Sequence, residues 1–175
     1  MAINKDDIME AALDLLNENG LEGLSMRKIA TKLGVSAPTL YFHVKDKNDL
    51  YSLLAEKICE NILNKTKDDA TLEELCYSAY NEYRKIPSVC QIFQQTETNG
   101  GARLELTCRF LDHLSEMGVR KPHLEPAASL LNNFILSCVA DDQKDPDKKE
   151  PSDALEAYRF MYGLDVIMKG IRQVK

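Results

Sequence analysis

Basic side chains gather in one short window of this chain, between Ser25 and Lys47. They are Arg27, Lys28, Lys32, Lys45 and Lys47, and the one acid in the window is Asp46, so the local formal charge is 5 − 1 = +4. Guanidinium and ammonium groups bind phosphate, and the hydroxyl and imidazole groups in the same window can hydrogen-bond to base edges. The chemistry that this window favours is therefore the binding of DNA.

The chain as a whole carries the opposite charge. Its formal net charge is −6 and its pI is about 5.1. This balance argues against a broadly basic protein that coats nucleic acid without specificity. A basic patch confined to one window instead fits a site-specific DNA reader, because phosphate neutralisation supplies affinity only where the reading helix docks.

Local signals predict two helices and a tight turn in this window. Ser25 can cap the first helix, and Gly34 can end it in a left-handed conformation. Ser36 can cap the second helix, which the pattern predicts from about residue 37 to residue 44, with Pro38 in its first turn. Such a pair is typical of a helix-turn-helix DNA-binding motif.

The second predicted helix has a core side and an outer side. Leu40 and Val44 are four residues apart and are expected to face the core. The positions left for the outside or the edges are Thr39, Tyr41, Phe42, His43 and Lys45. Of these, we expect Phe42 to pack in the core or at its edge rather than to contact a base.

Residues 4–54 resemble the DNA-binding domain of the tetracycline-repressor (TetR) family of bacterial transcription regulators. The segment AALDLLNENGLEGLSMRKIATKLGVSAPTLYFHVKDKNDL carries the resemblance, and PTLYFHVKDK is its most specific part. Carried over position by position, the resemblance implies DNA contacts by Arg27, Pro38, Thr39, Tyr41, His43 and Lys47. Where the tetracycline repressor has polar base-reading side chains this chain has Met26 and Ala37, so a different operator sequence is expected.

Length and patterning predict an all-α fold of two parts. Residues 1–46 form a three-helix helix-turn-helix domain, and residues 47–175 form a larger helical domain for effector binding and dimerisation, with a helix from about 47 to 64 connecting the two. Helical spacing continues after residue 64, and the charged segment 141–151 is expected to be a loop that Ser152 ends by capping the last helix. No stretch of eighteen apolar residues occurs, and the N-terminal residues are too charged for a signal peptide, so we expect a cytoplasmic protein without membrane contact.

The last two predicted helices are too apolar to be covered on one side only. Gly163 and Gly170 are seven residues apart, where the lack of side chains permits another helix to approach closely. The segments HLEPAASLLNNFILSCVADD and FMYGLDVIMKGI also resemble the C-terminal domain of the tetracycline-repressor branch, in which the last two helices pair with their symmetry mates. The predicted dimer interface is Phe134, Cys138, Tyr162, Gly163, Val166 and Gly170; packing within one chain is the alternative for each glycine.

The middle helices supply aromatic walls and a few polar groups for a small-molecule pocket. The candidates are Tyr77, Tyr80, Tyr83, Phe93, Phe110, His113, Asn132 and Asn133. Most aromatic residues at helical spacing are core residues, so fewer than half of these are expected to touch a ligand. His113 with its acidic neighbours is read as a solvated face, and neither a metal nor a cofactor is expected.

These patterns and the resemblance together predict a homodimeric regulator that binds a palindromic DNA operator and responds to a small-molecule effector of unknown identity. That it is a repressor released by the effector is what the family resemblance implies. An enzyme is not expected, because the chain has no zinc-protease motif, nucleophile elbow, P-loop or dinucleotide fingerprint. The alternative is a DNA-binding regulator switched by cysteine oxidation or by a protein partner. The five cysteines, at positions 59, 76, 90, 108 and 138, have no C-x-x-C spacing and are expected to be reduced thiols.

Overall fold

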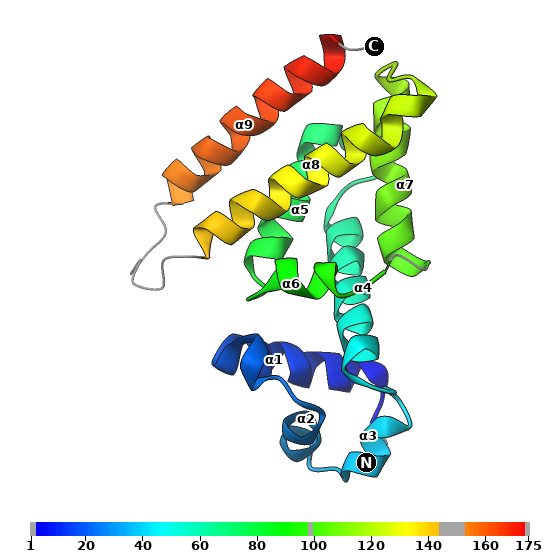
Figure 1. The fold of residues 1–175 in the computed structure, drawn as a ribbon, viewed down its shortest axis with the longest axis vertical. Helices are drawn as coiled ribbons and strands as arrows, with labels where there is room; N and C mark the ends of the chain where they lie inside the picture. Colours follow the sequence, from blue (N-terminus) through cyan, green and yellow to red (C-terminus); the bar gives the residue numbers. More distant parts are fainter. Residues whose placement is uncertain (1–2, 98–99, 144–152, 174–175) are drawn as a thin grey trace.

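The computed structural model describes residues 3–97, 100–143 and 153–173, and all regular structure in that part of the chain is helical (Figure 1). The helices are α1 (Lys5–Gly23), α2 (Met26–Leu33), α3 (Ala37–Tyr41), α4 (Lys47–Lys65), α5 (Leu72–Arg84), α6 (Val89–Gln94), α7 (Gly101–Glu116), α8 (Lys121–Asp142) and α9 (Asp153–Gln173). The predicted all-α fold class is confirmed.

The first three helices form a small unit in which side chains cap the helix starts. The Ser25 hydroxyl accepts the N–H of Lys28, and Ser36 accepts the N–H of Thr39. Between them Gly34 has φ +67°, the left-handed conformation that ends α2 where the sequence predicted it to end. The tight turn between α2 and α3 therefore follows from serine caps and one glycine.

Helix α3 ends at Tyr41, three residues before the predicted end at residue 44. The reason lies in the next helix: Asp49 of α4 accepts the backbone N–H of Lys45 at 2.8 Å, which turns the chain into α4 before α3 can continue. Val44 is nevertheless buried as expected, because the N–H of Val44 still bonds to the carbonyl of Leu40. The shortening therefore leaves Leu40 and Val44 in the core.

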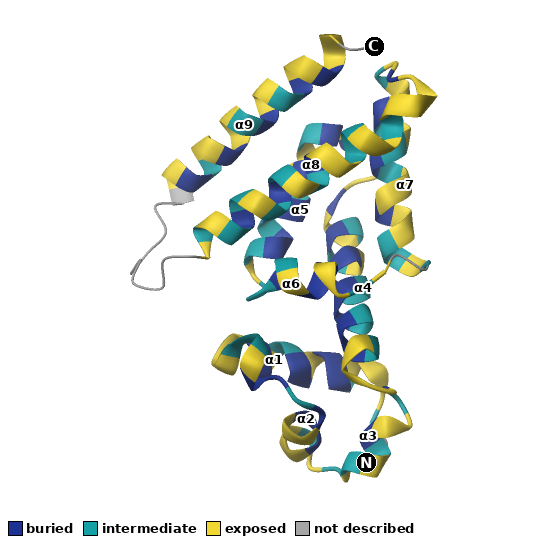
Figure 2. Cartoon of the chain, in the orientation of Figure 1, coloured by how far each residue is buried: buried dark blue, intermediate teal, exposed yellow. Residues whose placement is uncertain are grey.

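Helix α4 connects the small unit to the rest of the molecule (Figures 1 and 2). It packs on α1 and also on α5, α6 and α7. Seven of its residues are buried, at helical spacing along its length. Because this one helix packs on the small unit and on the rest of the molecule, a change in its tilt alters the position of the small unit.

Helix α8 packs on α5 and α7, and α9 packs on α8 at the end of the molecule away from the first three helices (Figure 1). Helix α8 begins at Lys121, so Pro122 occupies its first turn and Pro126 lies inside the helix. Asp141 and Asp142, predicted to be in a loop, belong to the last turn of α8; residues 144–152, including the predicted cap Ser152, lie outside the described residues.

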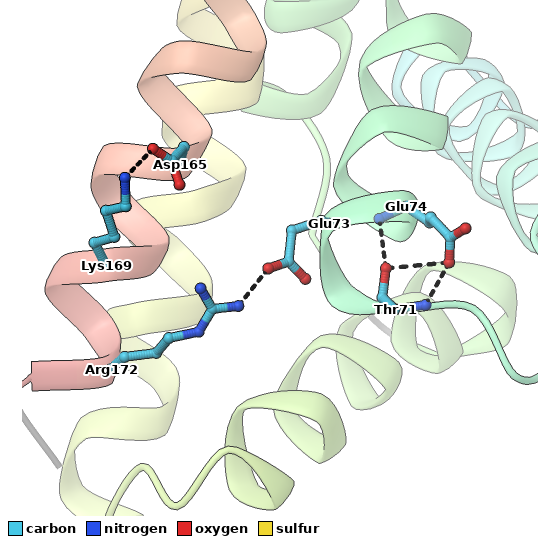
Figure 3. A network of polar contacts seen from close by, with 6 residues as sticks. All are labelled: Thr71, Glu73, Glu74, Asp165, Lys169 and Arg172. Carbon is cyan, nitrogen blue, oxygen red and sulfur yellow. Dashed lines mark hydrogen bonds and ion pairs between the residues drawn. The ribbon is translucent and has the colours of Figure 1, made fainter.

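Two sets of polar contacts fasten α9 to α5. At one end, Arg172 donates to Glu73 at 2.6 Å, beside the capping box that Thr71 and Glu74 form at the start of α5 (Figure 3). Toward the other end, Arg84 donates to the buried Glu156 at 2.8 Å. These contacts hold α9 in register along α5.

In the three described stretches, no helix is both long and apolar enough to cross a bilayer.

Candidate DNA-binding surface and ligand cavity

The six positions implied as DNA contacts lie on α2, on α3, in the turn that follows and at the first residue of α4. Arg27, Pro38, Tyr41 and Lys47 are exposed, while Thr39 and His43 are partly exposed. The Tyr41 side chain is 51 % accessible although tyrosine is a large amphipathic residue. The side chains expected to contact DNA are therefore accessible without any change in the fold.

Two residues of this unit, Phe42 and Met26, differ in exposure from what the sequence suggested. Phe42 is 88 % accessible, so the prediction that it packs in the core or at its edge is wrong. Phe42 keeps helical backbone angles (φ −68°, ψ −27°) and lies two residues from both Leu40 and Val44, so it faces away from the core that these two residues fill. Met26, in contrast, is buried, so this departure from the tetracycline repressor alters the core of the small unit and presents no side chain to DNA.

The basic patch is weaker than its formal charge indicates. Lys32 lies 3.1 Å from Asp14 and 3.0 Å from Glu18, both on α1. The hydrogen bond to Glu18 raises the pKa of the Lys32 ammonium. Within the described residues, none of the other four cations of the window forms an ion pair. Lys47, at the start of α4, places its ammonium 5.4 Å from the centre of the Tyr51 ring.

A cavity of about 410 Å³ lies between α4, α7 and α8. Four of the eight predicted pocket residues line it, namely Tyr83, Phe93, Phe110 and Asn132. Tyr83 and Phe93 pack with their ring centres 5.1 Å apart and form one aromatic wall. This volume lies in the range of small-molecule sites, roughly 300 to 1,000 Å³.

The other four predicted pocket residues lie elsewhere. Tyr77 lines a wider groove of about 950 Å³ between α5 and α9. Tyr80 is fully buried: its ring stacks on Phe160 at 4.1 Å between ring centres, and its hydroxyl donates to Asp142 at 2.6 Å. His113 is near Glu116 on its own helix, and Asn133 is exposed on α8.

Apart from Asn132, sequence reasoning missed the polar members of the cavity. Arg103, Thr107, Glu125 and Ser129 line it, together with Cys59 of α4. On α8 the lining residues fall at positions 125, 128, 129 and 132, which is the spacing of one helix face. That spacing could be read from the sequence. The sequence did not show that Arg103 of α7 faces these residues of α8, because helix packing determines which helix faces meet.

Arg103 is held by neutral acceptors. One terminal nitrogen donates to the carbonyl and the hydroxyl of Thr96, at 3.1 and 2.6 Å, and the other donates to the carbonyl of Phe93 at 3.4 Å. Its backbone N–H donates to the carboxylate of Glu56 on α4 at 3.3 Å. A Cβ at Gly101 would overlap that carboxylate, so glycine is needed where α7 meets α4.

Comparison with known protein families gives two matches that follow each other along the chain. Residues 8–54 match the family described as bacterial regulatory proteins, tetR family, and residues 64–159 match the tetracyclin repressor-like C-terminal domain. The second match alone covers more than half of the chain. The chain belongs to the TetR family. This is a family of bacterial DNA-binding transcription regulators rather than of enzymes.

The similarity of this TetR-family chain to curated relatives is strongest in the DNA-binding part. It is 52% identical over 56 residues to the class D tetracycline repressor protein of Escherichia coli, a match covering 32% of this chain and 26% of that protein. It is 28% identical over 139 residues to the repressor DrrR1 of Streptomyces coeruleorubidus, covering 77% of this chain and 52% of DrrR1. The chain thus spans about a quarter to a half of the length of these relatives.

Solved TetR-type structures share the fold along nearly the whole chain. Apo ActR from Streptomyces coelicolor superposes with a TM-score of 0.83 at 19% identity, covering 99% of this chain and 97% of ActR. BioQ from Mycobacterium smegmatis gives 0.82 at 20% identity, covering 99% of both chains. ActR has also been solved with actinorhodin, and BioQ with its double-stranded DNA operator.

The outer side of α9 in this TetR-family chain carries exposed apolar side chains. Tyr162 and Val166 from the predicted interface are exposed there, in line with Leu155 and Tyr158, and the two tyrosine rings stack at 6.2 Å. Exposed apolar residues at helical spacing form a continuous stripe, which is typical of a protein–protein contact surface.

The two glycines of α9 have different surroundings. A Cβ at Gly163 would lie 2.6 Å from the ring of Phe134 on α8, so packing within one chain accounts for this glycine. A Cβ at Gly170 would meet nothing within 4 Å. Phe134 itself stacks on Phe160 at 5.5 Å between ring centres, and both it and Cys138 are half-buried.

The five thiols differ in accessibility. Burial raises the pKa of Cys59 and of Cys76 to about 12 and that of Cys138 to about 11, and it also raises the pKa of Cys90. Cys108 on α7 is the one exposed thiol. A raised pKa lowers the thiolate fraction, which is the reactive form.

Proposed function

We propose that this TetR-family protein is a homodimeric, ligand-responsive transcriptional repressor. It binds a palindromic operator through α2, α3 and the start of α4, and a small-molecule effector in the cavity of about 410 Å³ releases it. The observation that carries the proposal is that one helix, α4, presents Lys47 to the DNA-binding surface and Cys59 to the cavity. These residues are twelve positions apart, which corresponds to about 18 Å of helix at a rise of about 1.5 Å per residue.

The six DNA-contact positions are part of the proposal. Tyr41 and Pro38 on the outer side of α3 enter the major groove with Thr39 and His43, while Arg27 and Lys47 contact phosphates or base edges nearby. The accessibility of these side chains and the match of residues 8–54 to the family support this assignment.

A dimer explains how so small a reading unit can be specific. One helix-turn-helix contacts too few bases to specify a single site in a genome, whereas two units bind two half-sites about 34 to 36 Å apart. The stripe formed by Leu155, Tyr158, Tyr162 and Val166 on α9 supports a two-fold interface, to which α8 contributes Phe134 and Cys138. Effector binding then favours a dimer with the wrong spacing, a coupling of about 1 to 3 kcal/mol in typical allosteric proteins.

A switch by cysteine oxidation is less favoured. Four of the five thiols have a raised pKa, which lowers the fraction of reactive thiolate. Cys108 is the one exposed thiol. A protein lacking all five cysteines is expected to keep its response to a small ligand. Regulation by a protein partner predicts instead no ligand response in either form.

The experiment that tests the proposal is selection of the purified protein on a random DNA duplex library. We expect enrichment of an inverted repeat that Tyr41→Ala abolishes. Tyr77→Ala, on α5 and remote from the DNA-binding surface, is the matched control and should enrich the same repeat. Failure to enrich any sequence at moderate salt, or equal enrichment by Tyr41→Ala, contradicts the proposal.

A further inference from the structure

The cavity between α4, α7 and α8 combines aromatic walls with a single cation. Tyr83, Phe93 and Phe110 supply the aromatic surface. Arg103 is the one cationic side chain in the described lining, and its guanidinium carbon lies 4.9 Å from the centre of the Phe93 ring. The acid of the lining, Glu125, is an exposed residue of α8.

The charge of Arg103 is not neutralised by any acidic side chain that the structure describes. A guanidinium has five N–H donors, and the three hydrogen bonds of Arg103 go to the neutral oxygens of Thr96 and Phe93. No ion pair to this guanidinium occurs within residues 3–97, 100–143 and 153–173. A partly buried cation of this kind favours an anion, because its charge lacks a partner and two of its donors remain.

The hydroxyl of Tyr83 is a second donor in the same cavity. Tyr83 is buried, and within the described part of the chain its hydroxyl makes no hydrogen bond. Burial raises the pKa of this hydroxyl, so it stays protonated and can donate. A cation and a phenol hydroxyl in one aromatic cavity complement an aromatic ligand that carries an anionic group.

We propose that the cavity binds an aromatic carboxylate, with its carboxylate on Arg103 and its ring against Tyr83, Phe93 and Phe110. The inference rests on the proposed function, since it names the chemical class of the effector for that same cavity. Planar carboxylates suit arginine because the guanidinium can donate two parallel hydrogen bonds to the two oxygens.

The same contact gives the ligand a route to the DNA-binding surface. Glu56 of α4 accepts the backbone N–H of Arg103, so α4 and the start of α7 are joined at the residue that binds the ligand. A ligand that moves Arg103 therefore also moves α4. Because α4 begins at Lys47, that movement changes the position of the helix-turn-helix unit.

The test uses two probes of the same shape, naphthalene-2-carboxylate and its neutral amide, titrated calorimetrically into the full-length protein. We expect the carboxylate to bind at least tenfold more tightly than the amide. Arg103→Met should weaken carboxylate binding about tenfold to hundredfold, as for loss of a charged hydrogen bond, and change amide binding less than threefold. Arg109→Met is the control, since Arg109 is also on α7 but donates to the carbonyl of Lys67 outside the cavity.

Circular dichroism shows whether Arg103→Met folds. If it does not, Tyr83→Phe is a second variant, which removes the hydroxyl and preserves the ring. It should weaken carboxylate binding about threefold to tenfold. Equal affinities for the two probes, an unchanged carboxylate affinity in both variants, or no binding of either probe at millimolar concentration overturns the inference. Operator binding by the same preparation, measured without probe, shows separately whether the regulator function stands.

Discussion

Replacing Tyr80 with phenylalanine removes one oxygen atom from the core and leaves the ring in place. That oxygen donates to Asp142 at 2.6 Å, and the Asp142 side chain is only 12% accessible, so water cannot readily replace the lost donor. The ring stacks on Phe160 in either form. The substitution therefore isolates the hydrogen bond that joins α5 to the end of α8.

The expected cost follows from the charge of the acceptor. Burial and the Asp142 acceptor both raise the pKa of the Tyr80 hydroxyl, so it remains a donor throughout the neutral range. Hydrogen bonds to charged groups contribute about 1.5 to 3 kcal/mol. The Asp142 carboxylate keeps its ion pair with Arg84, whose Nε lies 3.7 Å away, so no further penalty for an unpaired charge is added. We expect Tyr80→Phe to lower the free energy of unfolding by about 2 kcal/mol, or the melting temperature by roughly 4 to 8 °C.

Tyr77→Phe is the matched control, because Tyr77 lies one turn away on α5 and also packs against Phe160, at 6.2 Å between ring centres. Its side chain is 40% accessible, so its hydroxyl can bond to water, and we expect a change below about 0.5 kcal/mol. Urea unfolding at one protomer concentration measures the free energy of unfolding of both variants, since the stability of the proposed dimer depends on concentration. Equal midpoints for the two variants would refute the assignment of energy to the Tyr80–Asp142 bond.

Two further predictions concern charge and thiol reactivity. Lys47→Met should reduce the slope of log K against log salt concentration for operator binding by about 0.9. Lys32→Met should leave that slope unchanged, because Asp14 and Glu18 already pair with Lys32. Equal slopes in the two variants would contradict a phosphate contact by Lys47. With a thiol reagent at pH 8, the exposed Cys108 should react first. Cys59 and Cys76 have a pKa of about 12, so their thiolate fraction at pH 8 is about one in ten thousand, and they should react only as the pH rises or the chain unfolds. Peptide mapping identifies the labelled residues, and early labelling of Cys59 would contradict the burial argument.

Local signals were enough for the helix-turn-helix unit. Ser25 and Ser36 cap their helices by hydrogen bonds to residues three positions on, and Gly34 ends α2 through its own backbone conformation. Each of these effects acts over a few neighbouring residues, so it can be read from the order of the amino acids. Helix α3 was nevertheless predicted three residues too long, although the bond from the Lys45 N–H to Asp49 that follows its end is also local.

The ligand cavity depended on contacts between helices distant in the sequence. The aromatic pattern placed Tyr83, Phe93, Phe110 and Asn132 among the candidates, but it gave equal standing to Tyr80, which the packing of Phe160 buries in the core. Arg103 was not identified at all, since its importance comes from the neighbours that α4 and α6 bring to it.

The sequence by itself therefore determined the helical class and the helix-turn-helix motif, because periodicity and capping are local properties, although it did not predict the exposure of Phe42. The tertiary structure decided which aromatic residues surround a cavity, which cation of the basic patch is already paired, and why Gly163 lies against Phe134. The physical reason is that burial, ion pairing and close packing depend on which helix faces meet. Which faces meet depends on the packing of all core side chains together.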